Sequence, residues 1–173
     1  MSTLELKELS APAGEVIKIA AGKTLDLKSQ GNVTMPTGSV LQVVSHTNAA
    51  VNATTSTSWV ATNSTVTITP SSTSSKIYLV ATAPIYGSGD NQHTYTTIYR
   101  GSTNVNGTAE LQLHSAGTSS AGRWSNGSMS FLDSPSTTSA TTYTVYQRVY
   151  GAGTSHYDGN GGMAIITAME IQG

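Results

Sequence analysis

The chain has 173 residues, no cysteine and a net charge of −1, and charged residues make up only 10% of it. The absence of cysteine excludes disulfides and thiolate metal sites. The low, balanced charge lacks the signature of a protein that binds nucleic acid or an anionic membrane surface, so neither partner is expected. No apolar run approaches the roughly 20 residues that span a bilayer, so no membrane insertion is expected either.

The N-terminal segment, residues 1–13, is a predicted docking arm. It contains the run Leu4-Glu5-Leu6-Lys7-Glu8-Leu9, which is too short to form an independent helix. We expect it to order on another protein through Leu4, Leu6 and Leu9, and a frayed terminus is the alternative. The segment has no apolar signal-peptide core, so we expect the chain to fold in the cytoplasm where it is made.

Residues 14–38 carry a repeat with a period of about eight residues. Each unit is an apolar–polar–apolar triplet followed by a glycine-containing turn, as expected for a short strand that ends in a turn. The triplets are Ile17-Lys18-Ile19, Leu25-Asp26-Leu27 and Val33-Thr34-Met35. No unit can bury its own apolar face, so each must stack on the next or on the same unit of another chain. We predict a β-stem shared by three chains, and the alternative is three short strands that pack on the following domain.

Residues 39–173 predict one all-β domain, because alternating apolar segments follow one another with no helical period. The expected strands are Val40–Ser45, Trp59–Ala61, Val66–Thr69, Lys76–Ile85, Thr94–Tyr99, Ala109–His114, Ser128–Leu132, Thr142–Tyr150 and Met163–Ile171. The triplet Thr62-Asn63-Ser64 predicts a tight hairpin between two of them. The last segment places on one face Met163, Ile165, Met169 and Ile171.

Segment 76–85 predicts a strand that is covered on both sides. Ile77 and Leu79 lie on one face, and the other face, with Tyr78 and Val80, is also apolar. A homotrimer would cover the outer face, and the alternative is a second sheet of the same chain. The chain has 8 Tyr and 1 Phe, and Tyr suits sheet rims and subunit interfaces, because its ring can be buried while its hydroxyl reaches water or a neighbour.

Several phrases of the sequence resemble a known group of proteins. Gly14–Leu27 resembles the stems of fibre-like structural proteins of marine bacteriophages, especially cyanophages. Gly38–Val44, Thr67–Pro70, Ser74–Leu79 and Ile98–Asn104 resemble the terminal domain of these proteins, and together the phrases cover most of residues 14–104. The resemblance implies a homotrimeric virion fibre or spike with a short β-stem at 14–38 and a jelly-roll-like head at 39–173. It implies no shared catalytic residues and no cofactor.

Within this resemblance, the leading hypothesis is a tail-associated fibre located in the virion that contacts the host cell surface. A capsid-mounted fibre or decoration protein is the second hypothesis, and a monomeric carbohydrate-binding module is the third. The expected partners are two further copies of the chain, another virion protein bound through the N-terminus, and a host surface glycan or protein.

The candidate ligand-binding residues come from loops 86–92, 116–122 and 151–161, which we expect at one pole of the sandwich, opposite loops 101–107 and 133–140. Aromatic rings beside carboxylate, amide and imidazole groups suit flat polar ligands such as sugar rings. The candidates are Tyr86, Asp90, Asn91, His93, Arg123, Trp124, Asn126, Tyr150, His156, Tyr157, Asp158 and Asn160. The alternatives are glycine-rich solvated turns and, for Trp124, a place in the core.

Catalytic and metal chemistry lack support in the sequence. The four histidines, at 46, 93, 114 and 156, show no close metal-ligand spacing, so no metal site is predicted. An ion on a trimer axis, held by His93 with Asp90 or by His156 with Asp158, is the alternative. Pairs of carboxylates for glycoside hydrolysis lack a supporting motif, and no nucleophile elbow or phosphate-binding loop occurs, so we do not expect an enzyme.

Overall fold

The computed structural model describes residues 20–23, 33, 35–89, 93–115, 122–157 and 162–173, with backbone only for 112–115. The chain divides into two units, Met1–Thr34 and Met35–Gly173. The predicted docking arm with Leu4, Leu6 and Leu9, and most of the predicted stem, lie outside the described residues. In the described part, no element is a helix with the length and hydropathy needed to cross a membrane.

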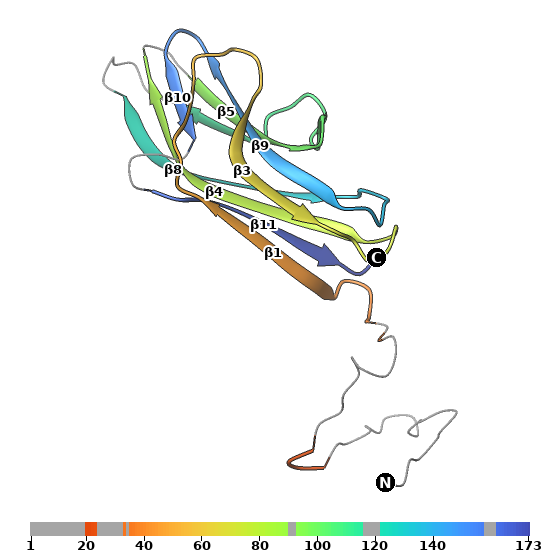
Figure 1. The fold of residues 1–173 in the computed structure, drawn as a ribbon. Helices are drawn as coiled ribbons and strands as arrows, with labels where there is room; N and C mark the ends of the chain where they lie inside the picture. The colour runs from red at the N-terminus through yellow and green to blue at the C-terminus, as the bar shows by residue number, and fades with distance from the viewer. Residues whose placement is uncertain (1–19, 24–32, 34, 90–92, 116–121, 158–161) are drawn as a thin grey trace. The chain divides into compact units, whose positions relative to one another are not determined.

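The second unit is a sandwich of two antiparallel sheets (Figure 1), which confirms the expected all-β sandwich. Sheet A contains β1 (Val40–Asn48), β2 (Asn52–Thr54), β4 (Lys76–Ser88), β8 (Arg123–Asp133), β10 (Thr154–Tyr157) and β11 (Ala164–Ile171). Sheet B contains β3 (Val60–Ile68), β5 (His93–Arg100), β6 (Thr103–Asn104), β7 (Gln112–Ser115) and β9 (Thr141–Tyr150).

The strand order is that of a jelly roll. In sheet A the order is β1-β11-β4, with β8 on the other side of β4. The short β10 pairs with the C-terminal end of β4, on the side opposite β8, and β2 pairs with β10. In sheet B the order is β3-β9-β5, with β7 and β6 paired to β5. Setting aside the short β2, β6 and β10, the described strands pair first–eighth–third–sixth in one sheet and second–seventh–fourth–fifth in the other. This is the connectivity of a double-sheet jelly roll.

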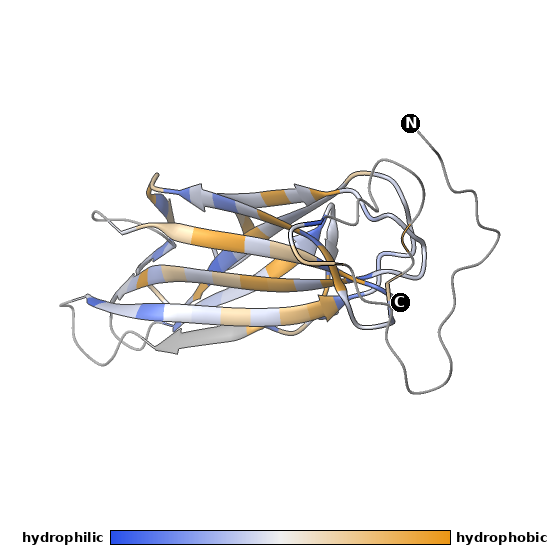
Figure 2. Cartoon of the chain, turned by 90° about the horizontal axis from the view of Figure 1, so that it is seen from below, coloured by the Kyte–Doolittle hydropathy of each residue, from blue (hydrophilic) through white to orange (hydrophobic). Residues whose placement is uncertain are grey.

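The core forms where the alternating patterns of the two sheets meet. Along β4 the residues from Ile77 to Ile85 at every second position are buried, and β9 buries Tyr143, Val145 and Val149 as its alternation predicts. Hydrophobic and hydrophilic positions therefore alternate along the strands in Figure 2. Sheet B packs on the Ile77 face of β4.

The other face of β4 is not covered by any described element of the chain. Tyr78 is 37% exposed there, and beyond it this face continues with the uncharged residues Val80, Thr82 and Pro84. The alternative that a second sheet of the same chain covers this face is therefore wrong for the described residues, because sheet B occupies the opposite face. On β11 the residues Ile165, Met169 and Ile171 share this uncovered side, and the exposed Met163 directly precedes the strand, while Ala164, Ile166, Ala168 and Glu170 face the core.

The predicted hairpin at Thr62-Asn63-Ser64 is wrong. These residues continue β3, with a register shift against β9 between Ala61 and Thr65. The Thr62 hydroxyl donates to the Val145 carbonyl (2.9 Å) and accepts from the Ser64 backbone N–H (3.1 Å). These side-chain hydrogen bonds satisfy the backbone around the irregularity, so three polar residues form a β-bulge within one strand.

Glu170 is a buried carboxylate that ties β11 to its neighbours. It accepts hydrogen bonds from the Ser71 backbone N–H (2.7 Å), from the hydroxyls of Ser71 and Ser75 (2.7 and 2.6 Å) and from Gln42 Nε2 (2.6 Å). Burial acts to raise the pKa of Glu170, but the hydrogen bonds outweigh it and hold the pKa below its usual value.

The sandwich has two poles. At the entry pole, the Gly38 N–H donates to the Gln172 carbonyl and the Gln172 N–H donates to the Ser39 carbonyl (both 2.8 Å), so the chain joins the sandwich beside its own C-terminus (Figure 1). At the distal pole, β4 and β9 end and β5, β8 and β10 begin. The loops that were expected to share one pole therefore do start from the same end of the sandwich.

Candidate ligand-binding site

The distal pole brings together three of the predicted site residues. In the register of sheet A, Tyr86 on β4 lies directly opposite Trp124 on β8 and, on its other side, opposite His156 on β10. The Tyr86 ring centroid lies 4.9 Å from that of Trp124 and 5.0 Å from that of His156, and the latter two lie 6.3 Å apart. We call these three residues the distal aromatic cluster.

The cluster borders an open depression with a volume of about 600 Å³. Trp124 is 43% exposed, so part of its ring face is available to a ligand and it is not a core residue. The remaining lining residues, which the sequence analysis missed, are Val51, Ser88 and Thr154. Thr154 and Ser88 lie opposite each other, two positions from His156 and Tyr86 along their strands. Because residues two positions apart on a strand lie on the same face, extending the prediction by two positions from Tyr86 and His156 would have identified both residues.

Two features hold the cluster in place. A side chain at Gly122 would begin 2.0 Å from the Tyr86 ring, so the absence of a side chain there lets the ring pack against the backbone. The buried Gln147 of sheet B accepts a hydrogen bond from the Ser155 hydroxyl (2.9 Å) and donates to the Asn52 carbonyl (2.7 Å). Gln147 thereby fixes β10, which carries His156, against the other sheet.

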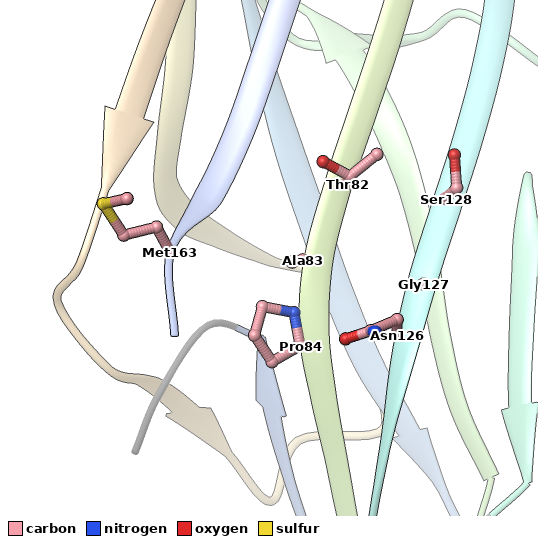
Figure 3. A pocket seen from close by; sticks show the side chains of 7 residues that line it. All are labelled: Thr82, Ala83, Pro84, Asn126, Gly127, Ser128 and Met163. Carbon is pink, nitrogen blue, oxygen red and sulfur yellow. The ribbon is translucent and has the colours of Figure 1, made fainter. Parts of the chain in front are cut away.

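A second, smaller depression of about 360 Å³ lies on the same face of sheet A (Figure 3). Pro84 of β4 and Asn126 of β8 lie side by side in this depression. Thr82 and Ser128 lie two residues away along the same strands, and Met163 borders the other side. Asn126 thus shares its face with Trp124, and its amide adds a donor and an acceptor beside the aromatic cluster.

The remaining predicted residues divide into four groups, the last of which lies on sheet B. Tyr157 is 1% exposed and belongs to the core, so it is not part of a surface site. Arg123 lies at the start of β8, one position before Trp124, and is exposed. The residues that lie outside the described part of the chain are Asp90, Asn91, Asp158 and Asn160. The proposed pairs of these carboxylates with histidine are therefore not described by the structure.

His93 and Tyr150 lie on the opposite side of the molecule, on the outer face of sheet B, where they pair directly. This face carries a network centred on Arg148, whose guanidinium lies 4.9 Å from the Trp59 ring centroid and 5.0 Å from that of Tyr95. Arg148 also forms an ion pair with Glu110. Partial burial acts to raise the pKa of Glu110, but hydrogen bonding and the Arg148 charge lower it overall.

The aromatic rings of sheet B stack on each other or on a guanidinium, whereas the rings of the distal aromatic cluster line an open depression. The rings of Tyr99 and Tyr146 stack at 4.0 Å, and Arg148 is enclosed by two rings and a carboxylate. Ring faces used in this way are not available to a ligand. We therefore place the candidate site at the Tyr86–Trp124–His156 depression.

Carboxylates in the described part of the chain serve structural roles. Asp133 accepts from Arg100 Nη1 and from the buried Tyr143 hydroxyl, both at 2.7 Å, and Glu110 is paired with Arg148. Burial, the hydrogen bond to Asp133 and the Asp133 charge together raise the pKa of Tyr143. No three His, Asp or Glu side chains among the described residues are grouped so that they could hold a metal ion.

Comparisons with known proteins found only distant structural similarity. No protein family and no curated protein matches the chain. A mutant VP2 protein of infectious bursal disease virus, in derived T=1 particles, has 9% identity and a TM-score of 0.40 over 87% of this chain. A structure of infectious bursal disease virus, Gx strain, has 13% identity and a TM-score of 0.37 over 87% of this chain. The chain spans 40% and 36% of the lengths of these two proteins, and at such TM-scores the similarity carries no argument about function.

Proposed function

We propose that the protein is a non-enzymatic structural protein of a virion, a tail-associated fibre or spike whose sandwich contacts the host cell surface. The observation that carries the recognition role is the position of the distal aromatic cluster. It lies at the pole opposite Gly38, where the N-terminal segment joins, and the 13 residues of β4 that separate the poles span about 40 Å. The resemblance of residues 14–104 to phage fibre proteins supports the virion role.

The ligand that this depression fits is a neutral sugar unit of a surface glycan. The exposed ring of Trp124 can stack on the C–H face of a sugar, and the hydroxyls of Ser88 and Thr154 can exchange hydrogen bonds with its hydroxyl groups. No carboxylate, lysine or arginine lines the depression in the described part of the chain, so it offers no counter-charge to an ionic ligand.

The test compares Trp124→Ala with Tyr150→Ala in adsorption of particles to host cells and in binding of the purified protein to cell-surface glycan. Both rings are exposed at the same pole, Trp124 on sheet A and Tyr150, 63% exposed, on sheet B. Loss of one stacking ring costs about 1 kcal/mol, roughly fivefold in affinity per site. Avidity across three copies enlarges this effect.

We expect Trp124→Ala to reduce adsorption and Tyr150→Ala to leave it near the wild-type level. The reverse order would move recognition to sheet B and overturn the assignment of the site. Unchanged adsorption in both variants would remove the host-contact role and favour the second candidate, a capsid-mounted fibre or decoration protein with little host affinity.

The N-terminal docking arm separates both virion roles from a free carbohydrate-binding module. Deleting residues 1–13 should release the protein from particles while the sandwich stays folded, since Met35–Gly173 forms its own compact unit. Retention on particles would contradict the docking role of Leu4, Leu6 and Leu9. A monomeric mass in solution would favour the binding module.

A further inference from the structure

The outer face of sheet A exposes an apolar row that crosses four strands. The register places Val43 of β1 opposite Met169 of β11, Met169 opposite Tyr78 of β4, and Tyr78 opposite Leu132 of β8. Val43 is 57% exposed and Leu132 is 54% exposed. Four apolar side chains therefore lie next to one another on the surface, at the end of the sheet near the entry pole. We call them the apolar row.

The rest of this face is neutral. Toward the distal pole the next rows contain Val80 and Ile165 among hydroxyl side chains, and Ser45 and Thr167 are hydrogen-bonded to each other (2.9 Å). Among the outward-facing described residues of β1, β11, β4 and β8, one is charged: Lys76, at the first position of β4, which donates to the Ser134 hydroxyl (2.8 Å). Contiguous apolar surface without charge is typical of the centre of a permanent protein interface.

Part of this face is available for such an interface, since the distal depression must stay open to a ligand. Outside the depression, β1, β11, residues 76–82 of β4 and residues 128–133 of β8 give a projected area of about 480 Å², at about 3.3 Å per residue and about 4.8 Å between strands, a little over half of what one partner contributes to a standard interface. The face is sheltered by no other described element of the chain, because sheet B packs on the opposite side of sheet A.

We propose that the entry-pole part of the outer face of sheet A, which carries the apolar row, is the surface through which three copies of this chain associate around a common axis. A neutral face suits self-association, because symmetry-related copies of a charge near the axis would repel one another. The row also begins near the point where the N-terminal repeat joins, since Val43 follows Gly38 by only a few residues. Stacking of three repeats would hold three copies of the sandwich together at this end. The inference shares with the proposed function the requirement for three copies.

This arrangement also locates the distal aromatic cluster. Tyr86 follows Tyr78 by eight residues of β4, about 26 Å along the same face. The three depressions would then lie close to the common axis at the distal end. Three nearby copies of a weak site are what avidity for a repetitive glycan requires. The outer face of sheet B, with its internally paired aromatic network, would form the outside of the assembly.

Because the chain contains no cysteine, single cysteines report the interface directly. We would replace Val43, Tyr78 or Leu132 by cysteine in the full-length protein, with Thr142→Cys as the matched control. Thr142 is an exposed strand residue on the outer face of sheet B. The native mass is measured first, and the variants are then treated with a short bifunctional maleimide and separated under denaturing conditions.

We expect a trimeric mass for all variants and covalent dimers for at least one variant of the apolar row, with none for Thr142→Cys. A trimeric mass with cross-links through Thr142→Cys alone, or through no position of the apolar row, would overturn this inference and leave the proposed function standing. A monomeric mass at working concentrations would overturn both the inference and the fibre assignment.

Discussion

The hydrogen-bonded carboxylate of Glu170 allows a quantitative prediction about the stability of the sandwich. One of its oxygens accepts from the Ser71 N–H and from the hydroxyls of Ser71 and Ser75, and the other accepts from Gln42 Nε2. In Glu170→Gln, the new side-chain NH₂ group would face the Gln42 NH₂ group, so two donors would meet with no acceptor between them. Gln42 cannot simply turn over, because the same Nε2 also donates to the Thr69 carbonyl (2.7 Å).

The expected cost follows from these bonds. A hydrogen bond to a charged group contributes about 1 kcal/mol more than a neutral one, and one donor pair becomes unsatisfied, so Glu170→Gln should lower the free energy of unfolding by about 3 to 4 kcal/mol. For a domain of this size, that corresponds to a fall in Tm of roughly 10 °C. The assay is denaturant unfolding at pH 7 at one fixed protein concentration, because the proposed association would also contribute to stability.

The pH dependence gives an independent check. The pKa of Glu170 is lowered in the folded state, so its contribution is present above its unfolded pKa and is lost as the pH falls through the lower folded value. The wild type should therefore approach the stability of Glu170→Gln in acid, while the variant changes less. Glu110→Gln is the control, because an ion pair this exposed contributes about 1 kcal/mol or less. Equal stability of Glu170→Gln and wild type at pH 7 would refute the reasoning.

Three further predictions concern other parts of the sandwich. Gly122→Ala should displace the Tyr86 ring, because the new Cβ would lie 2.0 Å from it, and should weaken glycan binding with little change in Tm. Tyr143→Phe should lower the free energy of unfolding by about 1 to 3 kcal/mol, measured by denaturation, because the Asp133 carboxylate loses a buried donor at 2.7 Å. Leu132→Lys should lower the temperature at which the assembly dissociates, followed by light scattering, whereas Thr142→Lys should not.

The sequence predicted best those strands whose inward positions are apolar. β4 and β9 follow the expected alternation, because burial of Ile77, Leu79, Tyr143 and Val145 dominates their placement. Tyr86 and Trp124 were expected in loops, but they lie on strands, because β4 extends beyond the predicted end at Ile85 and β8 begins before the predicted start at Ser128. Only the pairing register, which depends on long-range contacts, brings them side by side.

The predictions from the sequence were wrong where the inward-facing positions of a strand are polar. Thr62 and Ser64 face the core, and the Thr62 hydroxyl donates to the Val145 carbonyl of β9 and accepts from the Ser64 N–H, so a triplet typical of a turn continues a strand. β10 was missed in the same way: it is a short strand within the expected loop 151–161, and its buried Ser155 is held by Gln147 of the other sheet. Hydrogen bonds between distant segments decide these cases, and alternation of hydrophobicity does not record them.

The pattern of apolar residues along β11 bears both on the errors of prediction and on the proposed assembly. Its outward side carries Ile165, Met169 and Ile171, and its inward side ends in the buried carboxylate of Glu170. A strand that served only its own core would present the opposite arrangement, because burial of apolar surface is the main stabilising term and a buried charge is costly without partners. The hydrogen bonds to Glu170 remove the cost on the inner side. The outer side is explained if other copies of the chain cover it, as we propose, and the alternation along β11 would then describe contacts between copies as well as the core of one chain.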